Sequence, residues 1–279
     1  MASRTTRARI ARETIDILAR GWYTAPNGSR VPIADQLARA QASSRLVTPE
    51  GFGELFRRRT DVAPSHPTEF RVVNCTTLAA ARRLIHDSTA DVCCLNFASA
   101  KNPGGGFLNG SQAQEESLAR ATGLYACIAA MRAMYDTNRQ LGSCLYTDHM
   151  IYSPHVPVFR DDDDALLTEP YTVSVIAAPA VNAGALHDRE RRLIEPTMLA
   201  RTEKVLALAA AHRHESLVLG AWGCGVFRNE PADVARWFRQ HLGEGGAFGG
   251  AFRTVVFAVL DRSEGEQTLK PFENLFGGG

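Results

Sequence analysis

The stretch VCCLNFASAKNPGGGFLNGSQAQEE, residues 92–116, is the most informative part of the chain. Its beginning, Val92 to Phe97, is an apolar run typical of a buried strand. Three consecutive glycines follow, and a backbone without Cβ atoms can pass close to a ligand and direct N–H groups at an anion. Two adjacent carboxylates further on can carry proton chemistry. The stretch therefore combines a candidate phosphate loop and candidate acids: Gly104, Gly105, Gly106, Glu115 and Glu116.

A second glycine-rich loop lies much later in the chain. Residues 220–227 read GAWGCGVF and follow a short apolar run, Leu217 to Leu219, that is typical of another strand. Each feature alone has a simpler explanation, because glycines after a strand often form a plain turn and acids at a helix start suit the helix dipole. The two loops and the acids together make a more specific pattern.

This pattern resembles the bacterial-type poly(ADP-ribose) glycohydrolases, whose signature is three glycines, a short spacer and then Gln-Glu-Glu. The spacer here has seven residues, between Gly106 and Gln114. The resemblance extends over most of the chain and implies an α/β fold, a macrodomain-like mixed sheet sandwiched between helices, with an N-terminal helical extension. It divides the chain into an extension over residues 1–65 and one compact catalytic domain over residues 66–279.

The resemblance also implies an activity, the hydrolysis of ribose–ribose O-glycosidic bonds of poly(ADP-ribose) from chain ends, with release of ADP-ribose. Glu116 would be the general acid and would later activate water, while Glu115 would hold ribose hydroxyls. The implied substrate is poly(ADP-ribose) or an ADP-ribosylated protein, and the scheme needs no metal and no cofactor. The implied ADP-ribose-binding residues are Asn96, Gly104, Gly105, Gly106, Gln114, Gly223, Cys224, Gly225, Val226 and Phe227.

The chemistry of the residues restricts some of these roles. Glycosidic cleavage passes through an oxocarbenium-like state, so one group must protonate the departing oxygen. Side chains of adjacent helical residues point about 100° apart, so Glu115 and Glu116 cannot flank the bond as a typical glycosidase pair and need different tasks. Phe227 is suited either to the ribose contact or to the core, and Asn96 either to a ribose contact or to a turn. Cys224 has no evident His partner in the sequence, so we do not expect a nucleophile there.

The composition fits a folded protein without a membrane span. The chain has 279 residues, 45% of them apolar, and no apolar stretch approaches the roughly 18 residues of a membrane span. The six cysteines lack the paired spacing of a zinc site, and we interpret them as reduced thiols of a cytoplasmic protein. A monomer is the expected state. A net charge of +1 argues against DNA binding. Residues 1–60 nevertheless contain 11 Arg against 5 Asp or Glu, which indicates either a solvated helical surface or a surface for a polyanion.

Strand and helix patterns alternate along the rest of the chain, as expected for an α/β sheet with helices on both faces. Strands are predicted over 70–74, 92–97, 149–152, 171–177, 217–219 and 254–260. Helices are predicted over 9–20, 33–41, 77–86, 115–135, 189–211 and 232–242. The four acids Asp161 to Asp164 are predicted to form a solvated loop rather than a metal site, because consecutive carboxylates do not converge easily on one ion.

Three other functions share part of the pattern. A non-catalytic macrodomain reader of ADP-ribose would use the same two loops, and only the intact Gln-Glu-Glu argues against it. A hydrolase of mono-ADP-ribosylated protein would use the same chemistry. A nucleotide-dependent oxidoreductase would also have glycine-rich turns after strands, but the chain lacks G-x-G-x-x-G with an acidic residue about 20 positions further on.

Overall fold

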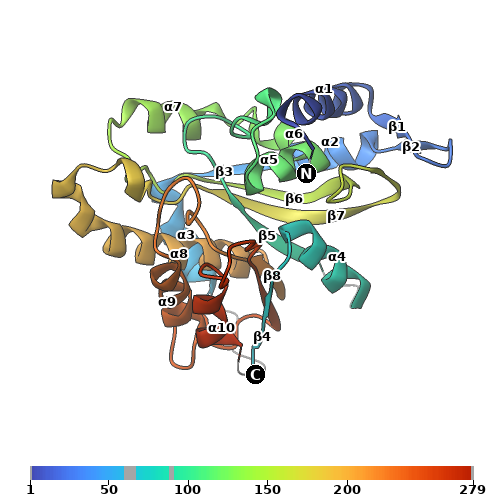
Figure 1. The fold of residues 1–279 in the computed structure, drawn as a ribbon. Helices are drawn as coiled ribbons and strands as arrows, with labels where there is room; N and C mark the ends of the chain where they lie inside the picture. Colours follow the sequence, from blue (N-terminus) through green and yellow to red (C-terminus); the bar gives the residue numbers. More distant parts are fainter. Residues whose placement is uncertain (1, 60–66, 88–90, 278–279) are drawn as a thin grey trace.

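We describe the protein from a computed structural model, which covers residues 2–59, 67–87 and 91–277. A large sheet forms its centre, and the strands of that sheet are β3 Arg45–Val47, β4 Glu69–Val73, β5 Val92–Phe97, β6 Met150–Arg160, β7 Leu166–Ala178, β8 Ser216–Leu219 and β9 Thr254–Ala258. Their order across the sheet is β3-β6-β7-β5-β8-β9-β4 (Figure 1). The strands from β7 to β4 run parallel, and β6 and β3 add antiparallel pairings at one edge.

Helices cover both faces of this sheet (Figure 1). One face packs against α3 Phe52–Arg59, α8 Ile194–Ala211, α9 Pro231–Leu242 and α10 Lys270–Phe276. The other face packs against α2 Ala34–Ser43, α4 Thr77–Asp87, α5 Gln114–Ala121, α6 Leu124–Ile128 and α7 Arg132–Gln140. Strands β5, β8 and β9 are buried along almost their whole length, as expected for parallel strands that are covered on both sides.

The chain begins with helix α1, Arg4–Arg20, followed by the hairpin of β1 Trp22–Thr24 and β2 Arg30–Pro32. The Ser3 hydroxyl caps α1 by accepting a hydrogen bond from the N–H of Thr6, and Gly21 ends it with a φ of 75°. The predicted helices at 9–20 and 33–41 are confirmed, with α1 starting earlier. Strand β3 joins this part of the chain to the large sheet, and the predicted domain boundary between residues 65 and 66 lies outside the described residues.

The prediction of one helix over 115–135 is wrong, because the chain leaves the helix at Thr122 and forms three short helices, α5 to α7. Thr122 takes an extended conformation and bridges to Val158 of β6, and the N–H of Gly123 donates to the Pro157 carbonyl. These pairings with the edge of β6 are tertiary contacts that local periodicity does not reveal. The apolar residues at helical spacing in this segment nevertheless face the core, with Leu124, Ile128 and Tyr135 buried and Met131 partly buried against them.

Strand β6 is longer than the predicted 149–152 because the sheet tolerates its two prolines. The register with β7 shifts between Ser153 and Val156, with His155 at a φ of 50°, so Pro154 lies in an irregularity of the strand. Strand β3 covers β6 only over residues 150–152, so Pro157 lies on a part of the edge that β3 does not pair. The sequence patterns also missed the short elements β1, β2, β3, α3 and α10.

The four acids at 161–164 form the turn that joins β6 to β7, as predicted. The Asp161 carboxylate accepts hydrogen bonds from the N–H groups of Asp163 and Ala165, at 3.0 and 2.8 Å, and so stabilises the turn itself. In the part of the chain that the structure describes, no group of three or more His, Cys, Asp or Glu residues is placed to hold a metal ion. No described helix is both long enough and apolar enough to cross a bilayer.

Candidate active site

Two glycine-rich loops meet at one edge of the sheet. The first follows β5 and the second follows β8, and these strands are parallel neighbours, so their carboxyl ends lie side by side. The contact is close, since a Cβ on Gly220 at the start of the second loop would lie 3.2 Å from the Phe97 ring at the end of β5. The fold thus brings together two segments that are more than a hundred residues apart in the sequence.

The glycine triplet wraps around the two acids. Gly104 and Gly105 have φ values of 69° and 58°, in the left-handed region that favours glycine, and a Cβ on Gly105 would collide with Oε1 of Glu116. The N–H of Gly106 donates to that same Oε1 at 3.0 Å, and the N–H of Gly105 donates to the Asn102 carbonyl. These N–H groups therefore organise the loop and the acid, rather than projecting outward as the sequence analysis expected for a phosphate loop.

Glu115 is the buried member of the acid pair, with 3% of its surface exposed. Its Oε2 accepts a hydrogen bond from the N–H of Ser99 at 2.7 Å, and its Oε1 accepts one from the Asn96 side chain at 3.3 Å. Burial raises the pKa of Glu115 to about 8, although these hydrogen bonds pull the pKa down. This carboxyl is therefore protonated near neutral pH. The other amide atom of Asn96, Oδ1, is buried and has no hydrogen-bond partner among the described residues.

Gln114 connects helix α5 to the strand before the loop. Its Oε1 accepts a hydrogen bond from the N–H of Phe97 at 2.9 Å, and its Nε2 donates to the Leu95 carbonyl at 2.7 Å and to the Thr77 hydroxyl at 3.1 Å. The side-chain amide thus pairs with β5 as a neighbouring peptide group would. This anchor sets the position at which the two following glutamates leave the helix.

The spacer between the triplet and the acids is held from two sides. Arg120, 2% exposed, donates to the Ser111 carbonyl at 3.0 Å and to the Gln112 side chain at 2.6 Å. From helix α1, Arg4 donates to the Asn109 carbonyl at 3.0 Å and Arg7 donates to the Gly110 carbonyl at 2.8 Å. The N-terminal helix is therefore part of the support of the acid-bearing segment.

The second loop, unlike the first, leaves backbone donors open. Gly223 has a φ of 77°, and the side chain of Asn229 holds the loop by donating to the Val181 carbonyl at 2.8 Å. The backbone N–H groups of residues 225–227 donate no hydrogen bond within the described chain. Val226 is 81% exposed, which is unusual for an apolar side chain. Consecutive unpaired N–H groups in a glycine-rich loop are suited to an anion.

Aromatic contacts connect the two loops. The Phe227 ring lies 5.9 Å from the ring of Tyr146, and the ammonium group of Lys101 in the first loop lies 5.9 Å from the same Tyr146 ring. Phe227 itself is half-buried, so its exposure lies between those expected for a core residue and for a ribose contact, the two roles that the sequence left open. Sequence reasoning missed Tyr146, which no motif marks, and it passed over Lys101 although this residue lies within the informative stretch.

Cys224 lies in the second loop but is not suited to nucleophilic chemistry. Burial raises the pKa of the Cys224 thiol to about 12, so the thiolate is scarce near neutral pH. This agrees with the expectation from the sequence. Its place in the loop makes it a neighbour of the open backbone donors.

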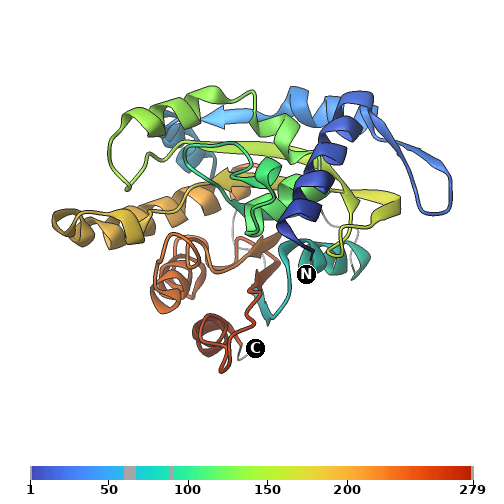
Figure 2. The same ribbon diagram turned by 45° about the horizontal axis from the view of Figure 1, so that its top comes forward.

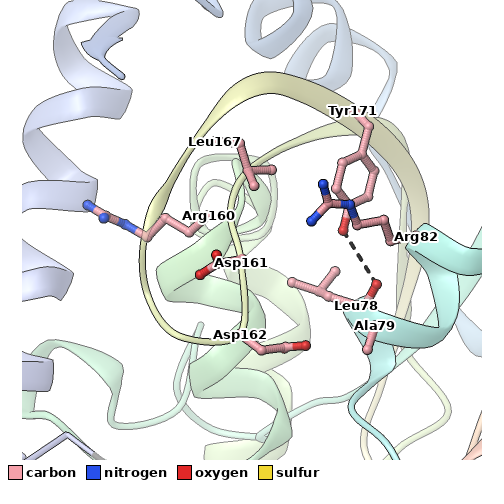
Figure 3. Close-up of a pocket in the computed structure, with 8 residues that line it drawn as sticks. All are labelled: Leu78, Ala79, Arg82, Arg160, Asp161, Asp162, Leu167 and Tyr171. Carbon is pink, nitrogen blue, oxygen red and sulfur yellow. Dashed lines mark hydrogen bonds between the residues drawn. The ribbon is translucent and has the colours of Figure 1, made fainter. Parts of the chain in front are cut away.

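The small cavity in Figure 3 lies away from these loops, between α4 and the β6–β7 turn. Its volume is about 30 Å³, and its lining residues are Leu78, Ala79, Arg82, Arg160, Asp161, Asp162, Leu167 and Tyr171. A cavity of that size holds roughly one water molecule. None of the residues that the sequence analysis placed in the site lines it.

Comparison with known proteins agrees with this site. Residues 11–161 match the family model described as "Microbial-type PARG, catalytic domain". The crystal structure of poly(ADP-ribose) glycohydrolase from Thermomonospora curvata is 49% identical, with a TM-score of 0.95 over 98% of this chain and 100% of that chain. The comparison with curated proteins found no match.

Two further solved structures carry ligands. The Thermomonospora curvata enzyme bound to the inhibitor ADP-HPD is 49% identical, with a TM-score of 0.91 over 97% of this chain and 99% of that chain. The enzyme from Deinococcus radiodurans in complex with ADP-ribose is 48% identical, with a TM-score of 0.81 over 85% of this chain and 96% of that chain. The expected macrodomain-like α/β fold is thereby confirmed. This chain belongs to the microbial-type poly(ADP-ribose) glycohydrolases, and it is a glycohydrolase enzyme.

Proposed function

We propose that the protein hydrolyses the ribose–ribose O-glycosidic bonds of poly(ADP-ribose) from chain ends and releases ADP-ribose. The observation that carries the proposal is the placement of two glutamates of unequal exposure behind a glycine loop, one buried and the other half-buried. In this proposal the protein acts as a cytoplasmic monomer, and the chemistry requires neither a metal ion nor a cofactor.

Glu116 is the general acid of the proposed reaction. Its Oε1 is held by the N–H of Gly106, and its Oε2 accepts no hydrogen bond within the described chain, so the second oxygen is available to the substrate. That oxygen gives a proton to the departing ribose oxygen as the oxocarbenium-like state develops. The resulting carboxylate then takes a proton from the attacking water.

Glu115 positions the ribose in this scheme. A carboxyl that is protonated near neutral pH can donate a hydrogen bond to a ribose hydroxyl as well as accept one. Its neutral form also keeps one negative charge out of a site that receives a diphosphate. Asn96 lies 3.3 Å away with its buried Oδ1 unpaired, and we assign this oxygen to a second ribose hydroxyl.

The diphosphate is assigned to the space between the loops. The open N–H groups of residues 225–227 supply donors, and the glycine loop that follows β5 bounds the same space from the other side. The aromatic pair of Phe227 and Tyr146 lies beside this space and is suited to a ribose face. The ADP-ribose and ADP-HPD complexes of the related enzymes support a ligand of the same class here.

The decisive test is release of product from purified polymer. We expect free ADP-ribose from the first time points, without accumulation of shorter oligomers, because cleavage from chain ends removes one unit at a time. Binding of polymer without any release would indicate the alternative, a non-catalytic reader of ADP-ribose. Early appearance of oligomers would contradict cleavage from chain ends. Release from mono-ADP-ribosylated protein at a rate equal to that from polymer would contradict the assignment to ribose–ribose bonds.

A further inference from the structure

Helix α1 presents a row of arginines to solvent. Its inner face is buried through Ile10, Ala11, Thr14 and Ile17. The outer face carries, at helical spacing, the exposed residues Arg9, Arg12, Asp16 and Arg20. Three positive charges against one negative charge leave this row basic.

The hairpin that follows α1 continues the row. Tyr23 and Val31 point inward and are buried, so by strand alternation Trp22 and Arg30 lie on the outer face. The guanidinium carbons of Arg20 and Arg30 lie 4.7 and 4.2 Å from the centre of the Trp22 ring. We call the side chains of Arg9, Arg12, Arg20, Trp22 and Arg30 the arginine surface.

The arginines of the arginine surface differ in their pairing from the buried arginines nearby. None of its four arginines forms an ion pair with the described residues, whereas the buried Arg120 and Arg160 nearby are paired with Asp164 and Glu13. Exposed guanidinium groups without carboxylate partners are available to phosphate, which they bind through a planar pair of donors. The half-buried Trp22 ring lies against the guanidinium groups of Arg20 and Arg30, so a base that stacks on this ring must displace one of them.

Helix α1, which carries most of the arginine surface, starts beside the segment that precedes the proposed general acid. Arg4 and Arg7 attach the start of α1 to the spacer that precedes Glu116, through the carbonyls of Asn109 and Gly110. From there α1 extends for about 25 Å, at about 1.5 Å per residue, toward the hairpin. Figure 2 shows α1 crossing in front of α5, with the hairpin projecting beyond its far end.

The leaving group of the proposed reaction is the rest of the polymer. The oxygen that Glu116 protonates belongs to the next ADP-ribose unit, so the polymer departs on the side of Glu116 and its spacer. We propose that the arginine surface binds the poly(ADP-ribose) chain beyond the cleaved bond, with its arginines on pyrophosphates and Trp22 on an adenine. This inference rests on the proposed function. It identifies the basic charge of the N-terminal residues as a surface for this polyanion rather than a merely solvated face.

The test compares substrates of different length. In the double variant Arg12→Ala/Arg30→Ala we expect kcat/KM for long polymer to fall about tenfold, while kcat/KM for a two-unit oligomer and the affinity for ADP-ribose stay within twofold. The slope of log(kcat/KM) for long polymer against log salt should fall by about 0.7 for each arginine removed. Trp22→Leu should lower kcat/KM for long polymer selectively. Trp22→Phe should lower it less, because phenylalanine keeps a stacking ring.

Arg253→Ala is the matched control, since Arg253 is exposed and lies at the amino end of β9, on the opposite edge of the sheet from the site. An equal loss in this control, an equal loss for oligomer and polymer, or an unchanged salt slope would overturn the inference. Inhibition of polymer cleavage by poly(A) RNA as strong as that by an equal concentration of competing poly(ADP-ribose) would also overturn it, because the surface would then be a general single-strand site. Absence of ADP-ribose release by the unmodified protein would instead contradict the proposed function.

Discussion

Oε1 of Glu116 accepts a hydrogen bond from the backbone N–H of Gly106 at 3.0 Å, so the last glycine of the triplet fixes the second acid of the signature. The middle glycine, Gly105, passes so close to the same oxygen that no side chain fits between them. The two halves of the signature are therefore one structural unit, in which the loop is shaped by the acid that it presents. This explains why a bare backbone is needed even where its N–H groups do not face a ligand.

The first prediction concerns Glu116→Gln. Glutamine keeps an oxygen that can accept from Gly106 but has no acidic proton, so we expect release of ADP-ribose from polymer to fall at least about 10²-fold, as for loss of a general acid. ADP-ribose affinity, measured by calorimetry, should stay within a few-fold. Glu244→Gln, at an exposed position between glycines, is the matched control and should change neither quantity. Turnover retained in Glu116→Gln would remove Glu116 from its proposed role.

The second prediction separates close approach from backbone strain. Gly105 and Gly142 both have positive φ values, 58° and 70°, but a Cβ on Gly142 would meet nothing within 4 Å. Alanine at either site should cost about 1–2 kcal/mol of stability through left-handed strain. Only Gly105→Ala should also displace the Glu116 carboxyl, and a shift of about 1 Å can cost about 10²-fold in rate. Thermal unfolding and polymer turnover of both variants check this, and equal turnover in the two would contradict it.

The third prediction concerns pH and Glu115. Burial raises its pKa from 4.5 to about 8 in the folded protein. Folding therefore takes up a proton between these values, and the stability contributed by this group is fully present below about pH 4.5 and is lost as the pH rises to about 8. Glu115→Gln keeps a neutral group there, so its melting temperature should fall less steeply than that of the unmodified protein between pH 5 and 8. Parallel curves would show that Glu115 is not protonated in the folded state.

Some parts of this architecture follow from local sequence patterns. The apolar run at 92–97 predicted β5 with its observed bounds, because a central parallel strand is apolar on both faces. Apolar runs likewise predicted the strands that precede the two glycine loops. Parallel pairing of these strands brings the two loops to one edge of the sheet. Each of these features is determined by a short segment of sequence, and the parts of the fold that pack against that segment do not alter its secondary structure.

Other parts depend on contacts that the sequence does not display. The helix break at Thr122 is caused by pairing with β6, and the continuation of β6 past Pro154 depends on a shift in register with β7. The raised pKa of Glu115 comes from burial beneath the loop, which neither residue type nor spacing reveals. Tyr146 comes from a segment without any motif. A buried arginine on a distant helix holds that segment by donating to the Tyr146 carbonyl.

That arginine, Arg201, is the subject of the fourth prediction. It is 1% exposed, bonds to the Asp148 carboxylate at 2.7 Å, and donates to the carbonyls of Pro179, Leu145 and Tyr146 at 3.1, 3.0 and 3.1 Å. It thus fastens the segment that carries Tyr146 to the end of β7. Because Arg201→Met leaves three carbonyls without their donor, it should lower the free energy of unfolding by about 3–5 kcal/mol, although Lys204 keeps the Asp148 carboxylate paired.

The matched control for this pair is on the surface. Arg236 bonds to Glu195 at 2.6 Å and to Asp233 at 2.8 Å, but it is half-exposed, so Arg236→Met should cost less than about 1 kcal/mol. Adding Asp148→Asn to Arg201→Met should recover none of the lost stability, because the Asp148 carboxylate is already paired with Lys204, and the second change removes that ion pair. ADP-ribose affinity should remain lower in this double variant, since Tyr146 has lost the donor that holds its carbonyl. Denaturant unfolding and ligand titration measure both effects, and full recovery of affinity in the double variant would show that Arg201 does not position Tyr146.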